Sequence, residues 1–276
     1  MVPLSIENLK ATCEDIRADI VKMTAAAGSG HPGGSLSSVE LLTALYFNVM
    51  NHKPLEPNWP DRDRFILSKG HICPILYAVM ARTGYFPVEE LMTLRKFGSR
   101  LQGHPNAKVL PGLESSSGSL GQGLSIANGL ALAAKLDNKS YRVYCLMGDG
   151  ELQEGQIWEA MMTAPHYRLD NVCAVVDFNN LQIDGTVDDV MGLEPLAKKW
   201  SSFNWHVIEI DGHDLSQVLE AYKEAANHKG QPSVIIAKTT KGKGVSFMED
   251  VAGWHGKSPN QEELKKALQE IYGGRN

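Results

Sequence analysis

Apolar residues recur at helical spacing from the start of the chain. Ile6, Leu9 and Cys13 open a stripe whose members alternate at intervals of three and four residues as far as Ala27. Such a stripe is typical of a helix that packs one face against a core. The helix is expected to end at Gly28, because glycine readily adopts the left-handed conformation that closes a helix.

Several local features are expected beyond this helix. Residues 31–34, His-Pro-Gly-Gly, predict a rigid loop with few side chains. Ser37 and Glu40 have the spacing of a capping box, which would start a second helix. A loop rich in Pro and Asn is expected over 51–63, and Pro87 is expected to open another helix.

From residue 64 onward, short apolar runs alternate with helical segments. The predicted strands cover 64–68, 142–147, 172–177, 207–210 and 233–237, and the predicted helices cover 72–80, 121–136, 155–167, 196–200, 215–227 and 261–271. Continuous Val, Ile, Leu and Ala in strands between such helices predict an α/β fold, a parallel sheet with helices on both faces. Neither a repeat nor a linker interrupts the pattern, so residues 1–276 are expected to form a single domain.

Composition limits the class of protein. The chain has 276 residues, with 27 Lys and Arg against 32 Asp and Glu, which gives a formal net charge of −5. Hydrophobic residues make up 43% and charged residues 21%, which is ordinary for a soluble globular protein. The mildly acidic balance without a basic run argues against nucleic-acid binding. The N-terminus lacks the apolar segment of a secretion signal, and no apolar stretch is long enough to span a membrane.

The cysteines indicate a reducing compartment. Cys13, Cys73, Cys145 and Cys173 are scattered and form no CxxC pair. This pattern favours buried, reduced thiols over disulfides or a zinc site, and it predicts a cytoplasmic protein. A chain of this length also buries a large core without disulfides.

Histidines stand beside glycines in several loops. His31, His71, His104 and His255 occur in the motifs GHPGG, KGH, QGHP and WHG, and His213 also follows a glycine. One such histidine is more often a turn residue than a functional one. Four of them in separate loops can converge as hydrogen-bond donors around an anionic or polyhydroxylated ligand. Their spacing matches no zinc motif.

Oxygen ligands follow two of the predicted strands. Asp149, within Gly148-Asp149-Gly150, follows one strand, and Asn179-Asn180 follows the next, about 30 residues later. Ligands of parallel sheets bind where the strands end. If the strands are neighbours, a carboxylate, an amide oxygen and a backbone carbonyl can meet there and form a Mg²⁺-type site completed by phosphate oxygens. A pair of ordinary strand-end turns is the alternative.

Two further features have both a structural and a functional interpretation. The loop 115–123, Ser-Ser-Ser-Gly-Ser-Leu-Gly-Gln-Gly, either cradles an anion or planar ring with its backbone groups or is a flexible turn. Glu154 and Glu159 are too far apart on the predicted helix to share one narrow stripe. They are either solvated acids near a helix N-terminus or interface carboxylates that share protons across a dimer.

With these motifs assembled, the chain resembles the N-terminal, pyrophosphate-binding half of the transketolase family. The resemblance extends to about Pro259 and is carried by GHPGG, SKGH, QGHP, GSLGQG, GDGELQEGQIWEA, DFNNLQIDG, AKTTKGKG and WHG. GDG followed by NN is typical of thiamine diphosphate enzymes in general, whereas the histidine loops and LQEG indicate the transketolase branch. The resemblance implies a transferase that moves a two-carbon ketol unit from a ketose phosphate to an aldose.

The resemblance also implies which residues hold the cofactor and metal. Asp149, Asn179 and the carbonyl of Leu181 would bind Mg²⁺ or Ca²⁺, which in turn binds the diphosphate of thiamine diphosphate. The residues implied to contact the cofactor are His71, Gly118, Ser119, Leu120, Gly150, Asn179, Lys241 and His255. Position 151 varies in the family, so Glu151 is assigned no role.

Catalytic and interface roles are implied in the same way. His31, His104 and His255 would surround the reacting part of the cofactor and the substrate hydroxyls, steering protons and stabilising developing charge. Glu154 and Glu159 match acids that link two active sites at a subunit interface.

The chain departs from the family in length. Family members carry a second half and a third domain, and the second half supplies the glutamate that activates the cofactor and the groups that hold the sugar phosphate. This chain ends at Asn276. We therefore expect one subunit of a split transketolase, completed by a separate C-terminal transketolase subunit in an α2β2 heterotetramer.

Two other functions remain alternatives. One is a related thiamine diphosphate enzyme, such as a 1-deoxyxylulose-phosphate synthase or a 2-oxoacid dehydrogenase subunit, although a 2-oxoacid donor needs no set of histidines for sugar hydroxyls. The other is a non-catalytic paralogue, against which the retained Asp149, Asn179 and loop histidines argue. The physiological sugar is left open, since pentose phosphate metabolism and specialised sugar catabolism both fit.

Overall fold

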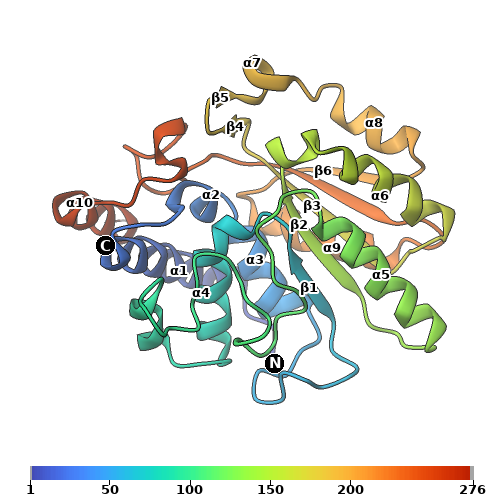
Figure 1. The fold of residues 1–276 in the computed structure, drawn as a ribbon, viewed down its shortest axis with the longest axis horizontal. Coiled ribbons are helices and arrows are strands. Elements are labelled where there is room, and N and C mark those ends of the chain that lie inside the picture. The colour runs from blue at the N-terminus through green and yellow to red at the C-terminus, as the bar shows by residue number, and fades with distance from the viewer. Residues whose placement is uncertain (1, 274–276) are drawn as a thin grey trace.

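The computed structural model describes residues 2–273, in which helices surround a central sheet (Figure 1). The strands of this sheet lie in the order β1-β2-β3-β7-β6, and every pair is parallel. Their bounds are β1 Arg64–Leu67, β2 Val143–Gly148, β3 Val172–Phe178, β6 His206–Asp211 and β7 Ser233–Lys238. The predicted parallel sheet is confirmed, and β2 and β3 are neighbours.

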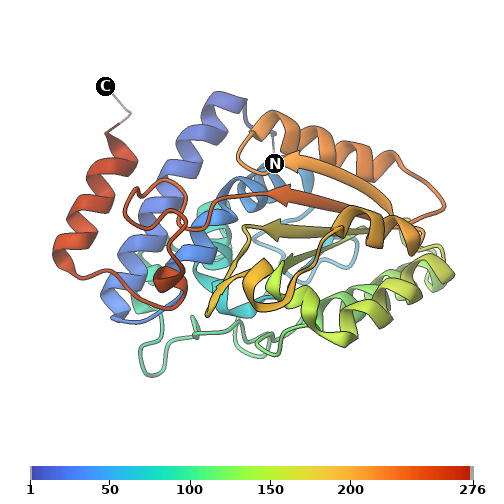
Figure 2. The same ribbon diagram turned by 90° about the horizontal axis from the view of Figure 1, so that it is seen from above.

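Helices cover both faces of the sheet (Figure 2). The α-helices are α1 Ile6–Ala27, α2 Pro32–Ser37, α3 Val39–Ala44, α4 Cys73–Thr83, α5 Gly123–Leu136, α6 Gly155–His166, α7 Val187–Met191, α8 Leu196–Ser202, α9 Leu215–Asn227 and α10 Gln261–Tyr272. One apolar core joins α1, α3, α4 and α9 to the sheet, and a second core joins α5, α6 and α8 to it. The α/β class expected from the sequence is confirmed.

Successive residues of a strand contribute to different cores. In β2, Tyr144 and Leu146 belong to the first core, whereas Val143, Cys145 and Met147 belong to the second, and all five are buried. Because both faces of the strand are covered, apolar residues occupy every position instead of alternating with polar ones. Polar chemistry is therefore confined to the strand ends.

The first helix has the bounds that its apolar stripe predicts. The Ser5 hydroxyl accepts a hydrogen bond from the Asn8 backbone N–H at its start, and Gly28 closes it with φ of 60°. Its buried face includes Leu9, Cys13 and Ile16. Among the helices of residues 2–273, none combines the length and apolar character needed to cross a membrane.

Some elements differ from the expectation. Residues 31–34 are not a loop throughout, because α2 begins at Pro32, whose fixed φ suits the first turn of a helix. The segment after Pro87 is helical, but it is a short 3-10 helix over Val88–Thr93. The motifs also gave no signal for a small hairpin, β4 Leu181–Gln182 and β5 Gly185–Thr186, which continues into α7.

The predicted capping box is wrong. The Ser37 hydroxyl donates to Asp177 Oδ2 at 2.5 Å instead of capping a helix. The Glu40 carboxylate accepts a hydrogen bond from Arg17 at 2.6 Å, and both side chains are buried. Tertiary partners distant in the sequence have replaced the local hydrogen bonds that the spacing predicted.

Candidate active site

A cavity of about 380 Å³ lies where β1, β2, β3 and β7 end. Its lining includes most of the residues that the motifs singled out for a cofactor: His31, His71, Gly118, Leu120, Asp149, Gly150, Asn179, Leu181, Lys241 and His255. The Gly148–Asp177 register pair brings the ends of β2 and β3 side by side, so the residues that follow both strands meet at one edge of the sheet.

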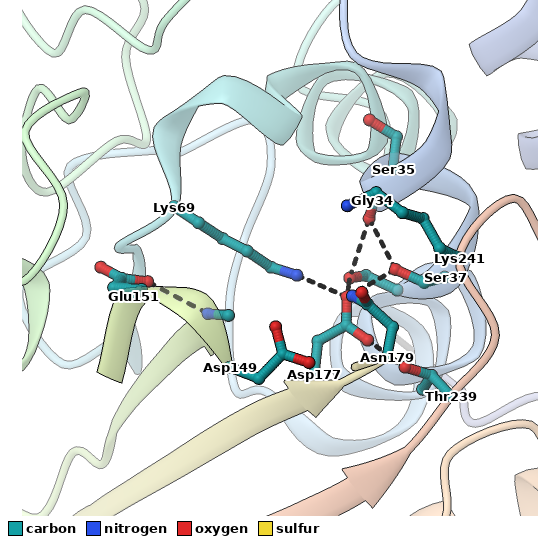
Figure 3. Close-up of polar contacts among 12 residues, drawn as sticks. Gly34, Ser35, Ser37, Lys69, Asp149, Glu151, Asp177, Asn179, Thr239 and Lys241 are labelled. Carbon is teal, nitrogen blue, oxygen red and sulfur yellow. Dashed lines mark hydrogen bonds and ion pairs between the residues drawn. The ribbon is translucent and has the colours of Figure 1, made fainter. Parts of the chain in front are cut away.

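Asp177, at the end of β3, is the centre of a buried polar cluster (Figure 3). Its carboxylate forms an ion pair with Lys69 and accepts hydrogen bonds from the hydroxyls of Ser37, Ser38 and Thr239. Burial acts to raise the pKa of Asp177, but Lys69 and the hydroxyl donors outweigh it and hold the pKa at about 2. Asp177 is therefore ionised, with its oxygens occupied by protein donors.

Asp149 follows β2 and faces the cavity, although it is only 3% exposed. It accepts hydrogen bonds from two backbone amides, the Gly150 N–H at 2.7 Å and the Asn180 N–H. Burial and the neighbouring Asp177 charge raise the pKa of Asp149 to about 6. No side-chain cation pairs with it directly among the described residues, so a bound cation would compensate its charge.

The oxygen donors expected for a metal lie beside Asp149. Asn179 Oδ1 accepts a hydrogen bond from the Leu181 N–H at 3.2 Å, and the Leu181 carbonyl accepts one from Lys241 Nζ at 2.8 Å. Each oxygen keeps a second lone pair. Residues 2–273 contain no group of three or more His, Cys, Asp or Glu side chains that could hold a metal ion. A carboxylate, an amide and a backbone carbonyl nevertheless match the hard oxygen ligands of Mg²⁺ or Ca²⁺.

Three of the loop histidines form a cluster. The ring centroids of His31 and His71 lie 5.1 Å apart, those of His71 and His255 lie 5.1 Å apart, and those of His31 and His255 lie 5.5 Å apart. They come from segments distant in the sequence: the start of α2, the turn after β1 and the 3-10 helix Ala252–His255. His31 Nδ1 is buried without a hydrogen-bond partner among the described residues, which leaves it for a ligand.

The histidine cluster lies in cationic surroundings. Burial and the Lys69 charge lower the pKa of His71 to about 2, and burial and Lys241 lower that of His255 to about 3. Burial lowers the pKa of His31 to about 4, with smaller contributions from neighbouring cations. The rings are neutral at pH 7, while burial and Lys69 lower the pKa of Lys241 to about 8. Neutral N–H donors beside ammonium groups fit an anionic ligand such as a diphosphate.

The remaining predicted cofactor and catalytic residues lie around this cluster. Lys241 Nζ contacts His255 Nδ1 at 3.0 Å. His104 does not line the cavity, but it lies against Gly118, where an added Cβ would meet its ring at 3.4 Å. Burial, then Arg95, lowers the pKa of His104. Ser119 lines a smaller neighbouring cavity instead.

Glu154 and Glu159 lie apart from each other. Glu154 is the N-cap residue of α6 at the edge of the cavity, and Glu159 lies further along the helix, outside the cavity lining. Both are exposed. Within this chain they share no contact, and their exposure leaves them accessible to a second chain.

Some residues of the site carried no recognised signal in the sequence. Lys69 and Asp177 lie in the quoted motifs SKGH and DFNN, but only the fold shows that they pair. Glu151 is buried and lines the cavity, although it was assigned no role. His213, the histidine left over from the loop set, is outside the cavity, where it bridges Glu40 and the Thr240 N–H.

The fold and the cavity together define an α/β protein with a polar cavity at the carboxyl ends of a parallel sheet. The family model for the transketolase thiamine diphosphate binding domain matches residues 9–275. The chain therefore belongs to this family, and thiamine diphosphate is the cofactor that the family binds.

Relatives match nearly the whole chain. It is 42% identical to one of the separate subunits of the apulose-4-phosphate transketolase of Phocaeicola vulgatus, over 97% of this chain and 95% of that one. It is 47% identical to a 6-deoxy-6-sulfo-D-fructose transketolase subunit of a Clostridium species, over 88% and 89%. These matches confirm the assignment to the N-terminal part of a transketolase, a transferase.

The solved structures give the same result for the fold. Transketolase from Campylobacter jejuni matches with a TM-score of 0.92 and 34% sequence identity, and the match covers 97% of this chain. This chain spans only 43% of the length of that protein.

Proposed function

We propose that this transketolase chain supplies the metal- and diphosphate-binding half of the active site and that a separate C-terminal chain supplies the rest. The complete enzyme would transfer a two-carbon ketol unit from a ketose phosphate to an aldose. The proposal is carried by one observation: a single cavity contains the oxygen donors of Asp149 and Asn179 together with Lys241 and three neutral histidines. Relatives named as separate transketolase subunits support it.

Asp149, Asn179 and the Leu181 carbonyl would hold the divalent cation, Mg²⁺ or Ca²⁺. Magnesium usually takes few protein ligands and leaves the other positions to water and phosphate oxygens, which suits a short donor set at the wall of a cavity. The raised pKa of Asp149 is the electrostatic cost of a buried carboxylate that a cation would offset.

The diphosphate would lie against His71, Gly150, Lys241 and His255. Lys241 supplies positive charge, and the histidine rings supply neutral N–H donors. At Gly150 an added Cβ would come within 3.2 Å of Gln182 Oε1, so the absence of a side chain keeps this wall open.

The ring end of the cofactor would meet the loop that carries Gly118, Ser119 and Leu120. Gly118 and Leu120 line the cavity, and Ser119 lies between them in the sequence. Backbone N–H and C=O groups can position a planar ring without a bulky side chain.

When bound, thiamine diphosphate supplies the electron sink that carries the two-carbon unit. The contribution of this chain is to bind the substrate hydroxyls and to hold or accept protons through His31, His104 and His255. The lowered pKa of each of these rings keeps it neutral, able to donate at one nitrogen and accept at the other. His31 Nδ1, which is buried and has no hydrogen-bond partner within residues 2–273, supports this role.

The proposed assembly contains two copies of each chain, with Glu154 and Glu159 at the interface between active sites. Their exposure in this chain is consistent with such a contact. We further propose a cytoplasmic enzyme, which four buried free cysteines support, acting on sugar phosphates of pentose phosphate metabolism or of a specialised sugar pathway.

Reconstitution tests the proposal. The chain is mixed with its partner chain, thiamine diphosphate and Mg²⁺, and two-carbon transfer between sugar phosphates is measured. We expect turnover that requires both chains, the cofactor and the metal. Turnover with pyruvate but not with sugars would contradict the donor assignment, and failure of the complex to bind the cofactor would contradict the site itself.

A further inference from the structure

Glu151 lies in the first turn after Asp149 and is only 3% exposed. Its Oε1 accepts hydrogen bonds from the Ser68 hydroxyl and from the Gly121 N–H at 2.9 Å. Its Oε2 accepts a hydrogen bond from the Gly148 N–H at 3.1 Å. A buried carboxylate is costly unless such donors satisfy it, so its position here is strongly specified.

The three donors come from three different segments. Ser68 follows β1, Gly148 ends β2, and Gly121 lies in the loop that leads into α5. Residues 118–120 of that loop precede Gly121 directly, and Gly118 and Leu120 line the cavity. Glu151 therefore joins the loop to the ends of β1 and β2.

The loop approaches the strand ends closely. A Cβ at Gly70 would lie 2.5 Å from Ser117 Oγ, and a Cβ at Gly123 would collide with Ser68 Oγ. The Ser68 hydroxyl also accepts a hydrogen bond from the Gly123 N–H at 3.0 Å while it donates to Glu151. Small residues let the loop approach the strand ends, and the Glu151 carboxylate supplies the polar anchor.

The diphosphate end of the cavity has different supports. Lys241 bonds to Leu181 and His255, and Lys69 pairs with Asp177. None of the hydrogen bonds described for the Glu151 carboxylate reaches these groups. Loss of the Glu151 anchor should therefore displace the loop and leave the cationic groups in place.

We infer that Glu151 is a positioning residue that sets the 118–121 segment, and with it the ring-binding end of the thiamine diphosphate site. The inference rests on the proposed function, because it assigns the loop to the ring of the cofactor. It predicts that a change at Glu151 weakens the binding of ligands that carry the ring and leaves the affinity for a ligand that carries only the diphosphate nearly unchanged.

The test compares two ligands on the complex of this chain with its partner chain. Isothermal titration calorimetry in the presence of Mg²⁺ gives the Kd of thiamine diphosphate and the Kd of inorganic pyrophosphate. Glu151→Gln keeps the side-chain shape but places an amide N–H₂ where a backbone N–H or hydroxyl now donates. We expect it to raise the Kd of thiamine diphosphate about tenfold, which corresponds to the loss of one charged hydrogen bond. The Kd of pyrophosphate should rise less than twofold.

Matched variants separate positioning from general damage. Asp149→Ala should weaken the binding of both ligands, in contrast to the selective effect expected of Glu151→Gln. Ser68→Ala removes one of the donors to Glu151 and should also weaken thiamine diphosphate binding selectively, by a smaller factor. This variant keeps the test valid if Glu151→Gln does not fold. An equal loss of both ligands in the folded variants, or no loss of either, would overturn the inference. A wild-type complex that binds neither ligand would overturn the proposed function and, with it, this inference.

Discussion

Asp149 and Asp177 are buried carboxylates at the ends of neighbouring strands, yet their surroundings are opposite. Asp177 has a lysine and three hydroxyls as partners, and its pKa falls to about 2. Among the described residues, Asp149 has only two backbone amides as donors, and burial together with the neighbouring Asp177 charge raises its pKa to about 6. The first is committed to holding the fold together, whereas the second is available to a ligand.

The carboxyl end of the sheet thus carries both a cluster that stabilises the fold, around Asp177, and a carboxylate available to a ligand, Asp149. The Asp177 cluster ties α2, β1 and β7 to the end of β3 through Ser37, Lys69 and Thr239. That framework holds the cavity wall that Asp149 lines.

The largest expected effect is the loss of the Asp177 charge. Asp177→Asn leaves Lys69 buried without its anion, which should lower the free energy of unfolding by about 3 kcal/mol or more. Urea unfolding followed by circular dichroism measures it. The double variant with Lys69→Met should recover part of the loss. A single variant as stable as the wild type would mean that the cluster does not support the fold.

A smaller effect is expected from pH, through a histidine next to this cluster. The pKa of His71 is about 2 in the folded chain, whereas an unperturbed histidine in the unfolded chain has a pKa of 6.5. Between pH 2 and pH 6.5 the unfolded chain therefore binds more protons than the folded chain. Stability should therefore fall as the pH drops below 6.5, by roughly 1 kcal/mol for each pH unit from this residue. Unfolding curves at pH 7.5 and 5.5 give the dependence, and His71→Asn should make it shallower. An unchanged slope in the variant would contradict a neutral, buried His71.

The smallest effect on stability is expected at Asp149. Asp149→Asn keeps the side-chain size and removes a charge that burial and Asp177 already disfavour, which offsets the cost of placing an amide N–H₂ against one of the two backbone N–H groups that donate to Asp149. The free energy of unfolding should change by less than about 1 kcal/mol, measured as for Asp177→Asn. A loss as large as that at Asp177 would remove the distinction between the two carboxylates.

The regular part of the fold could be predicted from the sequence because its signals are local. The stripe of α1 specifies a helix by its periodicity, and the short apolar runs of β2 and β3 between helical segments indicate buried strands. Strand adjacency then placed Asp149 and Asn179 at one edge. The motifs also singled out many of the residues that line the cavity, although their roles there remain predictions, whereas His104 and Ser119, which were also singled out, lie outside its lining.

What could not be predicted depends on partners distant in the sequence. The capping-box spacing of Ser37 and Glu40 was misleading because Asp177 and Arg17 compete for these side chains in the folded chain. Glu151 lies in the same motif as Asp149, but its function as an anchor depends on Ser68 and Gly121, which only the fold brings near. The local sequence pattern identifies polar residues at strand ends, but it does not tell which of them have their hydrogen bonds satisfied by other groups of the protein.

The most direct test of the central claim is the metal dependence of cofactor binding. Calorimetric titration of thiamine diphosphate into the complex of this chain with its partner is carried out with Mg²⁺ and with a chelator, for the wild type and for Asp149→Asn. We expect binding by the wild type that the chelator weakens about a hundredfold, and weak, metal-independent binding by the variant. Equal affinity of the two proteins with Mg²⁺ present would contradict the assignment of Asp149 as the carboxylate that holds the metal.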